Sequence, residues 1–232
     1  MQQIVLDLGL AAVPTLAGFR AGPNGAALAH LQACVAGDGT CGGAAAVPTY
    51  LWGESGSGKT HMLRAVRESL RERGASVGWL DPDGAADQPF DDSWAAVLID
   101  DVHDFDPAQQ HTAFNWFVNA LTPADARPRW VLAAGALPPA DLALREDLRT
   151  RLGWGQVFHL QTPDEAERRA VLREAAEARG VHLGDEVVDF MLNRFSRDLG
   201  SLMQLLDELD RYALRTQRAI TIPLIKSMLE ND

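Results

Sequence analysis

The sequence predicts an α/β protein, with a doubly wound parallel sheet of five strands followed by a small C-terminal domain of helices. Three observations predict this fold class. Five short apolar runs alternate with segments of helical length, a glycine-rich loop follows the first run, and no strand-like run follows residue 161. Such alternation is typical of parallel sheets that carry helices on both faces.

The predicted strands are short and apolar. The run 94–99 is continuously apolar and ends in acid, which is typical of a buried parallel strand. Segment 59–73 has apolar residues near helical spacing and ends before Gly74. The predicted strands are 49–52, 77–80, 94–99, 130–134 and 157–160, and the predicted helices among them are 26–35, 59–73 and 107–121. Ligands of such sheets bind beyond the carboxyl ends of the strands.

The rest of the chain is predicted to be helical. Thr162 and Glu165 have the spacing of a capping box, with Pro163 at the first helical position. This helix should end at Gly180, and further helices are expected at 185–195, 199–215 and 222–230. We therefore divide the chain into an N-terminal arm and tether at 1–24, an α/β base at 25–161 and a helical lid at 162–232.

The composition argues against several classes of protein. Of 232 residues, 21 are Lys or Arg and 32 are Asp or Glu, which gives a formal net charge of −11. Proteins that coat DNA or bind membrane surfaces draw affinity from basic residues, so neither class is expected. No run of 18 apolar residues occurs, so no membrane span is expected. Cys34 and Cys41 are too few for a disulfide framework and are expected as free thiols.

The acid is concentrated in one stretch. Residues 81–110 hold nine aspartates and no Lys, Arg or Glu, so the other 202 residues carry a net charge of only −2. The simplest interpretation is a solvated acidic face.

The glycine-rich loop is a candidate nucleotide site. It matches G-x-x-x-x-G-K-[ST] and lies between a predicted strand and a predicted helix. Backbone N–H groups of such a loop wrap phosphates, Lys59 would reach the β- and γ-phosphates, and the Thr60 hydroxyl would bind Mg²⁺. The alternative is a Gly/Ser turn that happens to precede a lysine. The predicted nucleotide-binding residues are Gly53, Glu54, Ser55, Gly56, Ser57, Gly58, Lys59, Thr60 and His61.

Two aspartates at the end of the run 94–99 complete this candidate site. A phosphate loop needs a further acid to hold Mg²⁺, and Asp100 is placed to supply it. Asp101 stands where a carboxylate would activate water, although an aspartate reaches less far than a glutamate. The alternative is an exposed acidic loop.

Together with the helical lid, these motifs resemble the AAA+ ATPases. Three further stretches, 97–103, 148–155 and 218–226, resemble DnaA-related members of that family. The residues at 153–156 and 206–211, and the end of the sequence before any DNA-binding domain, resemble the Hda family, the regulatory inactivators of DnaA. The resemblance covers nearly the whole chain.

The resemblance implies that Arg151 is an arginine finger. Such an arginine acts across a subunit boundary and stabilises charge on the transferring phosphoryl group. In this family it acts on ATP bound to DnaA. The alternative is a helix-surface arginine among the charges that surround it, Arg145, Glu146, Asp147 and Arg149.

The resemblance also implies a peptide that binds the DNA polymerase III sliding clamp. Members of the family begin with Gln-Leu-x-Leu-x-Leu, which Gln3, Ile4, Leu6 and Leu8 match with one change. An extended segment of this kind places alternate apolar side chains in a pocket. Residues 9–24 would then be the tether. The alternative is a first strand of this protein's own sheet.

Two departures from the family bear on hydrolysis by the protein itself. Ala136 and Leu137 stand where relatives have a polar sensor after the fourth strand, and Gly200 stands where the lid carries a sensor arginine. Arg194 or Arg197 are the nearest substitutes. The protein's own hydrolysis should therefore be weak, with ADP or ATP acting as a structural ligand.

The resemblance implies a cytoplasmic, nucleoid-associated regulator that reaches DNA only through the clamp and promotes hydrolysis of DnaA-bound ATP. Self-association is also compatible with the sequence. Two alternatives are an autonomous ATPase of helicase-loader type that acts on single-stranded DNA and an adaptor that only bridges clamp and initiator.

Overall fold

The computed structural model describes residues 14–37, 47–123, 126–195 and 199–229. They form two compact units, an α/β unit at Pro14–Asp164 and a helical unit that begins at Glu165. The predicted fold class, a five-stranded parallel sheet with helices and a following helical part, is confirmed.

The five strands form one parallel sheet in the order β2-β3-β4-β1-β5. They are β1 (Thr49–Trp52), β2 (Ser76–Leu80), β3 (Trp94–Ile99), β4 (Trp130–Gly135) and β5 (Gln156–His159). The middle strand, β4, is buried at all six positions, which explains its continuous apolar sequence. Because β4 lies between β3 and β1, the segments that leave these three strands start side by side at one edge of the sheet.

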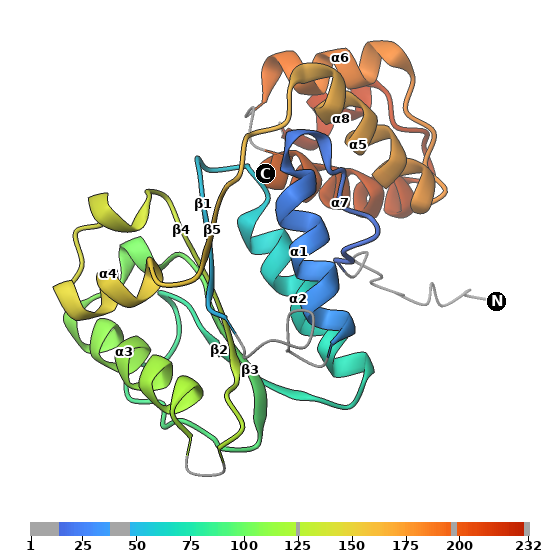
Figure 1. Cartoon of the computed structure of the whole chain (residues 1–232). Helices are drawn as coiled ribbons and strands as arrows, with labels where there is room; N and C mark the ends of the chain where they lie inside the picture. The colour runs from blue at the N-terminus through green and yellow to red at the C-terminus, as the bar shows by residue number, and fades with distance from the viewer. Residues whose placement is uncertain (1–13, 38–46, 124–125, 196–198, 230–232) are drawn as a thin grey trace. The chain divides into compact units, whose positions relative to one another are not determined.

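Helices cover both faces of the sheet (Figure 1). α1 (Gly25–Ala36) and α2 (Lys59–Glu72) pack on one face, and α3 (Pro107–Leu121) and α4 (Glu146–Leu152) on the other. Side chains alternate along β3, so Leu98 joins the first core while Val97 and Ile99 join the second. α4 was not predicted, because seven residues are too few for a periodic apolar pattern. Short 3-10 turns lie at η1 (Gly22–Asn24), η3 (Val102–Asp104) and η4 (Pro139–Asp141).

The acidic segment between β2 and β3 is fastened to α3 through its backbone. Gln109 donates from Nε2 to the carbonyl of Pro82 at 2.8 Å, Thr112 donates to the carbonyl of Ala86, and Trp116 donates from Nε1 to that of Gln88 at 3.0 Å. The three donors lie on one face of α3, at spacings of three and four residues. The carbonyls are therefore held while the carboxylates of this segment stay mostly exposed, as the solvated acidic face predicted.

The helical unit contains four helices among its described residues. They are α5 (Glu165–Ala178), α6 (Asp185–Arg194), α7 (Leu199–Thr216) and α8 (Ile222–Leu229). Their shared core includes Val188, Leu206 and Leu224, all fully buried. α5 begins at Glu165, two residues later than the predicted cap at Thr162 requires. In the described part of the chain, no helix combines the length and apolar character that a membrane span needs.

One cysteine differs from expectation. Cys34 lies fully buried on α1 and is disulfide-bonded, so the predicted free thiol is wrong at this position. The second cysteine of the chain, Cys41, lies outside the described residues. Two cysteines alone give no signal that separates a thiol from a disulfide.

Replacing Gln109 with alanine should destabilise the α/β unit. The Gln109 side chain is 5% exposed, and its Oε1 also accepts the backbone N–H of Asp106 in the capping box of α3. Its loss leaves partly buried backbone groups without their side-chain partner, which costs about 1–3 kcal/mol. Urea unfolding should show this decrease, whereas Asn119→Ala, on the exposed side of α3, should change stability by less than about 0.5 kcal/mol. Equal effects of the two variants would contradict the role of Gln109.

Candidate nucleotide site and arginine surface

The glycine-rich loop leads from β1 directly into α2. Gly53 and Gly58 have φ values of +154° and +94°, where side chains are disfavoured. A Cβ at Gly53 would lie 2.2 Å from the carbonyl oxygen of Leu160, and a Cβ at Gly58 would lie 2.6 Å from the ring of Phe19. Both positions therefore require glycine for space as well as for backbone conformation.

Lys59 begins α2 and is buried inside the loop, with 7% of its surface exposed. Its ammonium donates to the carbonyl oxygens of Gly53 at 2.8 Å and Glu54 at 2.9 Å, and it lies 3.4 Å from Ser57 Oγ. A positive charge is thus fixed at the amino end of a helix, beside loop N–H groups. This combination is what a bound phosphate requires.

Thr60 and Asp100 come from different elements and meet beside the loop. Asp100 follows β3 and is 3% exposed. Burial and the neighbouring charge of Asp101 raise the pKa of Asp100 to about 6, although hydrogen bonds from the Thr60 side chain and the Asp101 backbone act in the opposite direction. The charge of Arg64 also favours the ionised form, but burial and Asp101 outweigh it together with these hydrogen bonds.

A Mg²⁺ ion fits this pair. Magnesium in phosphate sites is usually held by one or two protein oxygens together with phosphate and water. The Thr60 hydroxyl and the Asp100 carboxylate are two such oxygens, and a cation there would relieve the cost of burying Asp100. Among the described residues, no group of three or more His, Cys, Asp or Glu could hold a metal alone.

Asp101 has an unusual backbone. Its φ of 46° and ψ of 43° place it in the left-handed region, immediately before η3. Aspartate tolerates this conformation better than most residues. Local strain of this kind is often found at functional sites, and the role of Asp101 as a water-activating carboxylate stays a prediction.

The chain that leaves β4 carries no polar side chain toward this site. Gly135, Ala136 and Leu137 follow one another there, between the segments that leave β1 and β3. The Tyr50 hydroxyl donates to the carbonyl of Leu137 at 2.8 Å, and burial holds the pKa of Tyr50 above its ordinary value, so it stays a donor. A Cβ at residue 135 would lie 2.3 Å from this hydroxyl oxygen. Tyr50 therefore fixes a backbone turn that offers no side-chain donor to a phosphate.

The segment before α1 packs on the phosphate loop. Leu16 is buried, and the rings of Phe19 and His61 lie 5.8 Å apart. Asn24 is also buried, and its amide makes reciprocal hydrogen bonds with the backbone of Gln161, at 3.0 and 2.9 Å. Residues 14–24 are thus attached to the base, whereas the sequence assigned them to a tether. The sequence reasoning missed Phe19 and Asn24, because their contacts are more than 40 residues away along the chain.

Arg151 lies on α4, on the other side of the sheet from α2. Its guanidinium carbon lies 5.1 Å from the centre of the Phe114 ring and 5.2 Å from that of Trp154. Within the described residues, no carboxylate or hydrogen-bond acceptor pairs with its side chain. In contrast, Arg145 makes two bonds of 2.7 Å with Asp147. Of the charges that surround Arg151 in the sequence, Arg145 and Asp147 therefore pair with each other.

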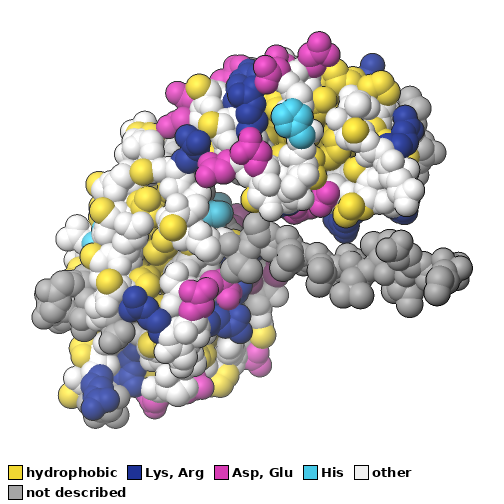
Figure 2. Space-filling model, turned by 90° about the vertical axis from the view of Figure 1, so that its right-hand side faces the viewer, with side chains coloured by type: hydrophobic (Ala, Val, Ile, Leu, Met, Phe, Trp, Pro, Cys, Tyr) yellow, Lys and Arg dark blue, Asp and Glu magenta, His cyan; other side chains and the backbone are white. Residues whose placement is uncertain are grey.

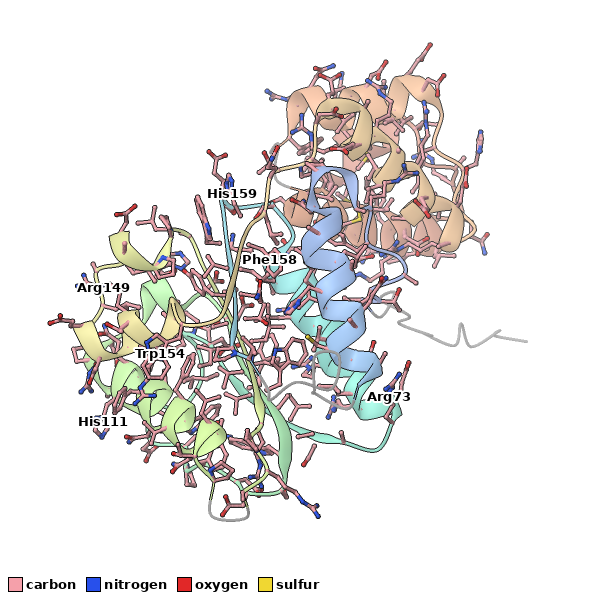
Figure 3. The ribbon with its side chains drawn as sticks, viewed as in Figure 1. Arg73, His111, Arg149, Trp154, Phe158 and His159 are labelled. Carbon is pink, nitrogen blue, oxygen red and sulfur yellow. The ribbon has the colours of Figure 1, made fainter. Side chains whose placement is uncertain are left out.

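The remaining predicted residues lie either outside the described part of the chain or in the helical unit. Gln3, Ile4, Leu6 and Leu8 lie outside the described residues, as does Arg197. Gly200 lies in the first turn of α7, and Arg194 ends α6. At the edge of the sheet, His159 of β5 stacks on Trp52 of β1 with ring centres 4.0 Å apart, an arrangement that the sequence did not predict (Figure 3).

Comparison with known proteins agrees with this geometry. Residues 164–229 match the family model described as "Hda, lid domain". The whole chain has an AAA+ fold, and its lid matches that of Hda. Domain III of the replication initiation protein DnaA from Thermotoga maritima superposes with a TM-score of 0.74 at 21% identity, covering 95% of this chain and 97% of that one.

Two other solved structures have a similar fold. AMPPCP-bound DnaA from Aquifex aeolicus gives a TM-score of 0.65 at 21% identity, covering 88% of this chain and 73% of that one. The RuvB Holliday junction branch migration motor of Thermotoga maritima gives 0.63 at 14% identity, covering 91% and 69%. At these identities the comparisons support the AAA+ fold of the base, while the link to Hda comes from the lid.

Replacing Asp100 with asparagine should stabilise the protein at neutral pH without nucleotide or metal. The raised pKa means that the folded protein keeps a proton on Asp100 which the unfolded chain releases near pH 4. Stability is therefore lost as the pH rises from about 4 to about 6, and above that range the charged carboxylate costs on the order of 2–3 kcal/mol.

In urea unfolding with EDTA, the Asp100→Asn variant should have a higher free energy of unfolding than the wild type. This difference should grow between about pH 4 and 6 and stay constant above pH 6. Asp83→Asn, at an exposed aspartate of the acidic segment, is the control and should show a much smaller change. A gain at Asp100 that does not vary with pH would contradict the assignment.

Proposed function

We propose that this AAA+ protein is an Hda-like regulator of replication initiation, which promotes hydrolysis of ATP bound to DnaA by presenting Arg151. The observation that carries the proposal is the Arg151 guanidinium, which is held by aromatic rings and has no anionic partner among the described residues. A guanidinium in this condition is available to a phosphate on another subunit.

The protein's own nucleotide would then be a ligand more than a substrate. Lys59, Thr60 and Asp100 supply what is needed to bind ADP or ATP with Mg²⁺, and the AMPPCP-bound DnaA of similar fold supports a nucleotide at this site. The backbone turn at Ala136 and Leu137 offers no side-chain donor to the γ-phosphate, which supports weak hydrolysis. A bound nucleotide that favours the folded state stabilises it by mass action.

Access to DNA would be indirect, through the sliding clamp. The clamp peptide is assigned to Gln3, Ile4, Leu6 and Leu8 from the sequence. On the face drawn in Figure 2, basic and acidic side chains of the described residues are interspersed and form no continuous basic stripe. A groove for single-stranded DNA would need such a stripe, so this face gives no support to the helicase-loader alternative.

Substituting Arg151 with alanine should abolish stimulation of ATP hydrolysis by DnaA in the presence of clamp-loaded DNA. Arginine fingers contribute on the order of 10³-fold or more to such rates, so the variant should fall to the unstimulated rate. Arg149→Ala, two residues away on the same helix, is the matched control and should keep most of the stimulation. Normal stimulation by Arg151→Ala would contradict the assignment of Arg151 as an arginine finger.

A second variant separates the clamp from the finger. Gln3→Ala with Leu6→Ala should lose stimulation on clamp-loaded DNA while α4 remains intact. Unchanged clamp binding by this double variant, measured directly, would show that the N-terminal assignment is wrong. Stimulation that survives Arg151→Ala but disappears with the double variant would favour the adaptor that only bridges its partners.

The purified protein should contain or bind ADP or ATP but turn ATP over slowly by itself. Saturating nucleotide, at about 100 times its dissociation constant, should add about 2.7 kcal/mol to the free energy of unfolding. Lys59→Ala should lose this effect, because the loop then lacks its ammonium. Robust turnover by the isolated wild-type protein would favour the helicase-loader alternative.

A further inference from the structure

Trp154 is the most exposed of the large apolar side chains in the described part of the chain, at 64%. It follows α4 on the side of the sheet that carries α3 and α4 (Figure 3). Large aromatic side chains are usually buried to a greater extent. Its indole faces the guanidinium of Arg151, and the ring of Phe114, from α3, also contacts that guanidinium.

We propose that Phe114 and Trp154 form an aromatic clamp that positions the arginine finger, Arg151, before it meets the partner's nucleotide. The proposal rests on the function proposed above and names the residues that prepare Arg151 for it. Phe114 and Trp154 are positioning residues, since they act through Arg151 and do not themselves contact the reacting atoms.

The clamp restrains the cation without using its hydrogen bonds. Aromatic faces attract a guanidinium through the ring quadrupole within about 6 Å, and all five N–H donors remain available to a planar anion. A carboxylate would restrain the same side chain but would occupy those donors. Arg145 illustrates the difference, because it also lies 5.1 Å from the Phe114 ring but is committed to Asp147 through two hydrogen bonds.

The backbone of Trp154 is held by the start of β5. A Cβ at Gly155 would lie 1.7 Å from the carbonyl oxygen of Pro48, and the next residue, Gln156, donates its N–H to that carbonyl at 2.9 Å. The N–H of Trp154 also donates to the carbonyl of Arg151 at 3.1 Å. Finger and indole thus belong to one fixed turn between α4 and the sheet, and their separation does not depend on a flexible loop.

Positioning lowers the entropy that is lost when the finger engages. An arginine side chain has many rotamers, and ordering it in advance shifts the entropy cost of fixing it to folding of the free protein. The effect should appear in the maximal rate of the stimulated reaction, because the finger contributes most strongly in the transition state.

The test compares Trp154→Phe, which keeps an aromatic face, with Trp154→Leu, which keeps apolar volume alone. In the DnaA hydrolysis assay on clamp-loaded DNA, Trp154→Leu should lower the rate at saturating protein by about two- to fivefold, the size of one exposed cation–π contact. Trp154→Phe should keep most of the wild-type rate. Because Trp154 is exposed, both variants should fold, and equal melting temperatures would verify this.

The Arg151→Ala background makes the role specific. In that background, Trp154→Leu should have no further effect, because the aromatic clamp no longer has an arginine to position. Three outcomes would each overturn the aromatic clamp. They are equal rates for Trp154→Phe and Trp154→Leu, a change confined to the half-saturating concentration, and a further loss of rate in the Arg151→Ala background. If Arg151→Ala lowers the rate and Trp154→Leu does not, only the aromatic-clamp proposal is wrong. If Arg151→Ala has no effect, the proposed function fails as well.

Discussion

The parallel pairing of β1 and β3 with the strand between them, β4, is the constraint on which the nucleotide site depends. In this register Trp52 of β1 pairs with Gly135 of β4, and Ile99 of β3 pairs with Ala133. The phosphate loop and Asp100 therefore leave the same edge of the sheet one strand apart, and Thr60 at the start of α2 reaches Asp100. Burial at this edge has a cost, visible in the raised pKa of Asp100, which a cation would relieve. The same burial fixes Lys59 inside the loop.

The sequence was sufficient for features whose cause is local. The strand and helix positions follow from apolar periodicity, and Gly53 and Gly58 follow from a motif whose backbone requires glycine. It was insufficient where a residue acts through distant neighbours. Asn24 joins the start of α1 to Gln161, 137 residues later, and no pattern in the sequence connects the two. α4 is a single short helix whose presence is decided by packing of Leu148 and Leu152 on the sheet, which a seven-residue window cannot reveal.

The acidic stretch combines two different physical situations. Asp100 is a buried carboxylate whose charge is costly and useful to a cation, whereas the carboxylates between β2 and β3 are mostly solvated and belong to a segment held by its backbone. The sequence distinguishes them only by the apolar run before Asp100. Gln109, Thr112 and Trp116 of α3 supply the hydrogen bonds that the segment would otherwise lack. An acidic segment is in this way held through its backbone while its carboxylates stay in solvent.

The two cations of greatest interest are treated in opposite ways by the fold. Lys59 is buried and satisfied by loop carbonyls, so it is prepared for a ligand that this chain binds itself. Arg151 is held by aromatic faces and keeps its donors free, so it is prepared for an anion that the described residues do not supply. The segment at the end of β4 is apolar and is fixed by Tyr50. A polar side chain there would contact the γ-phosphate of a nucleotide in this chain's candidate site. Under the proposed function, these features of the described residues suit assistance to hydrolysis on a partner better than hydrolysis by this chain alone.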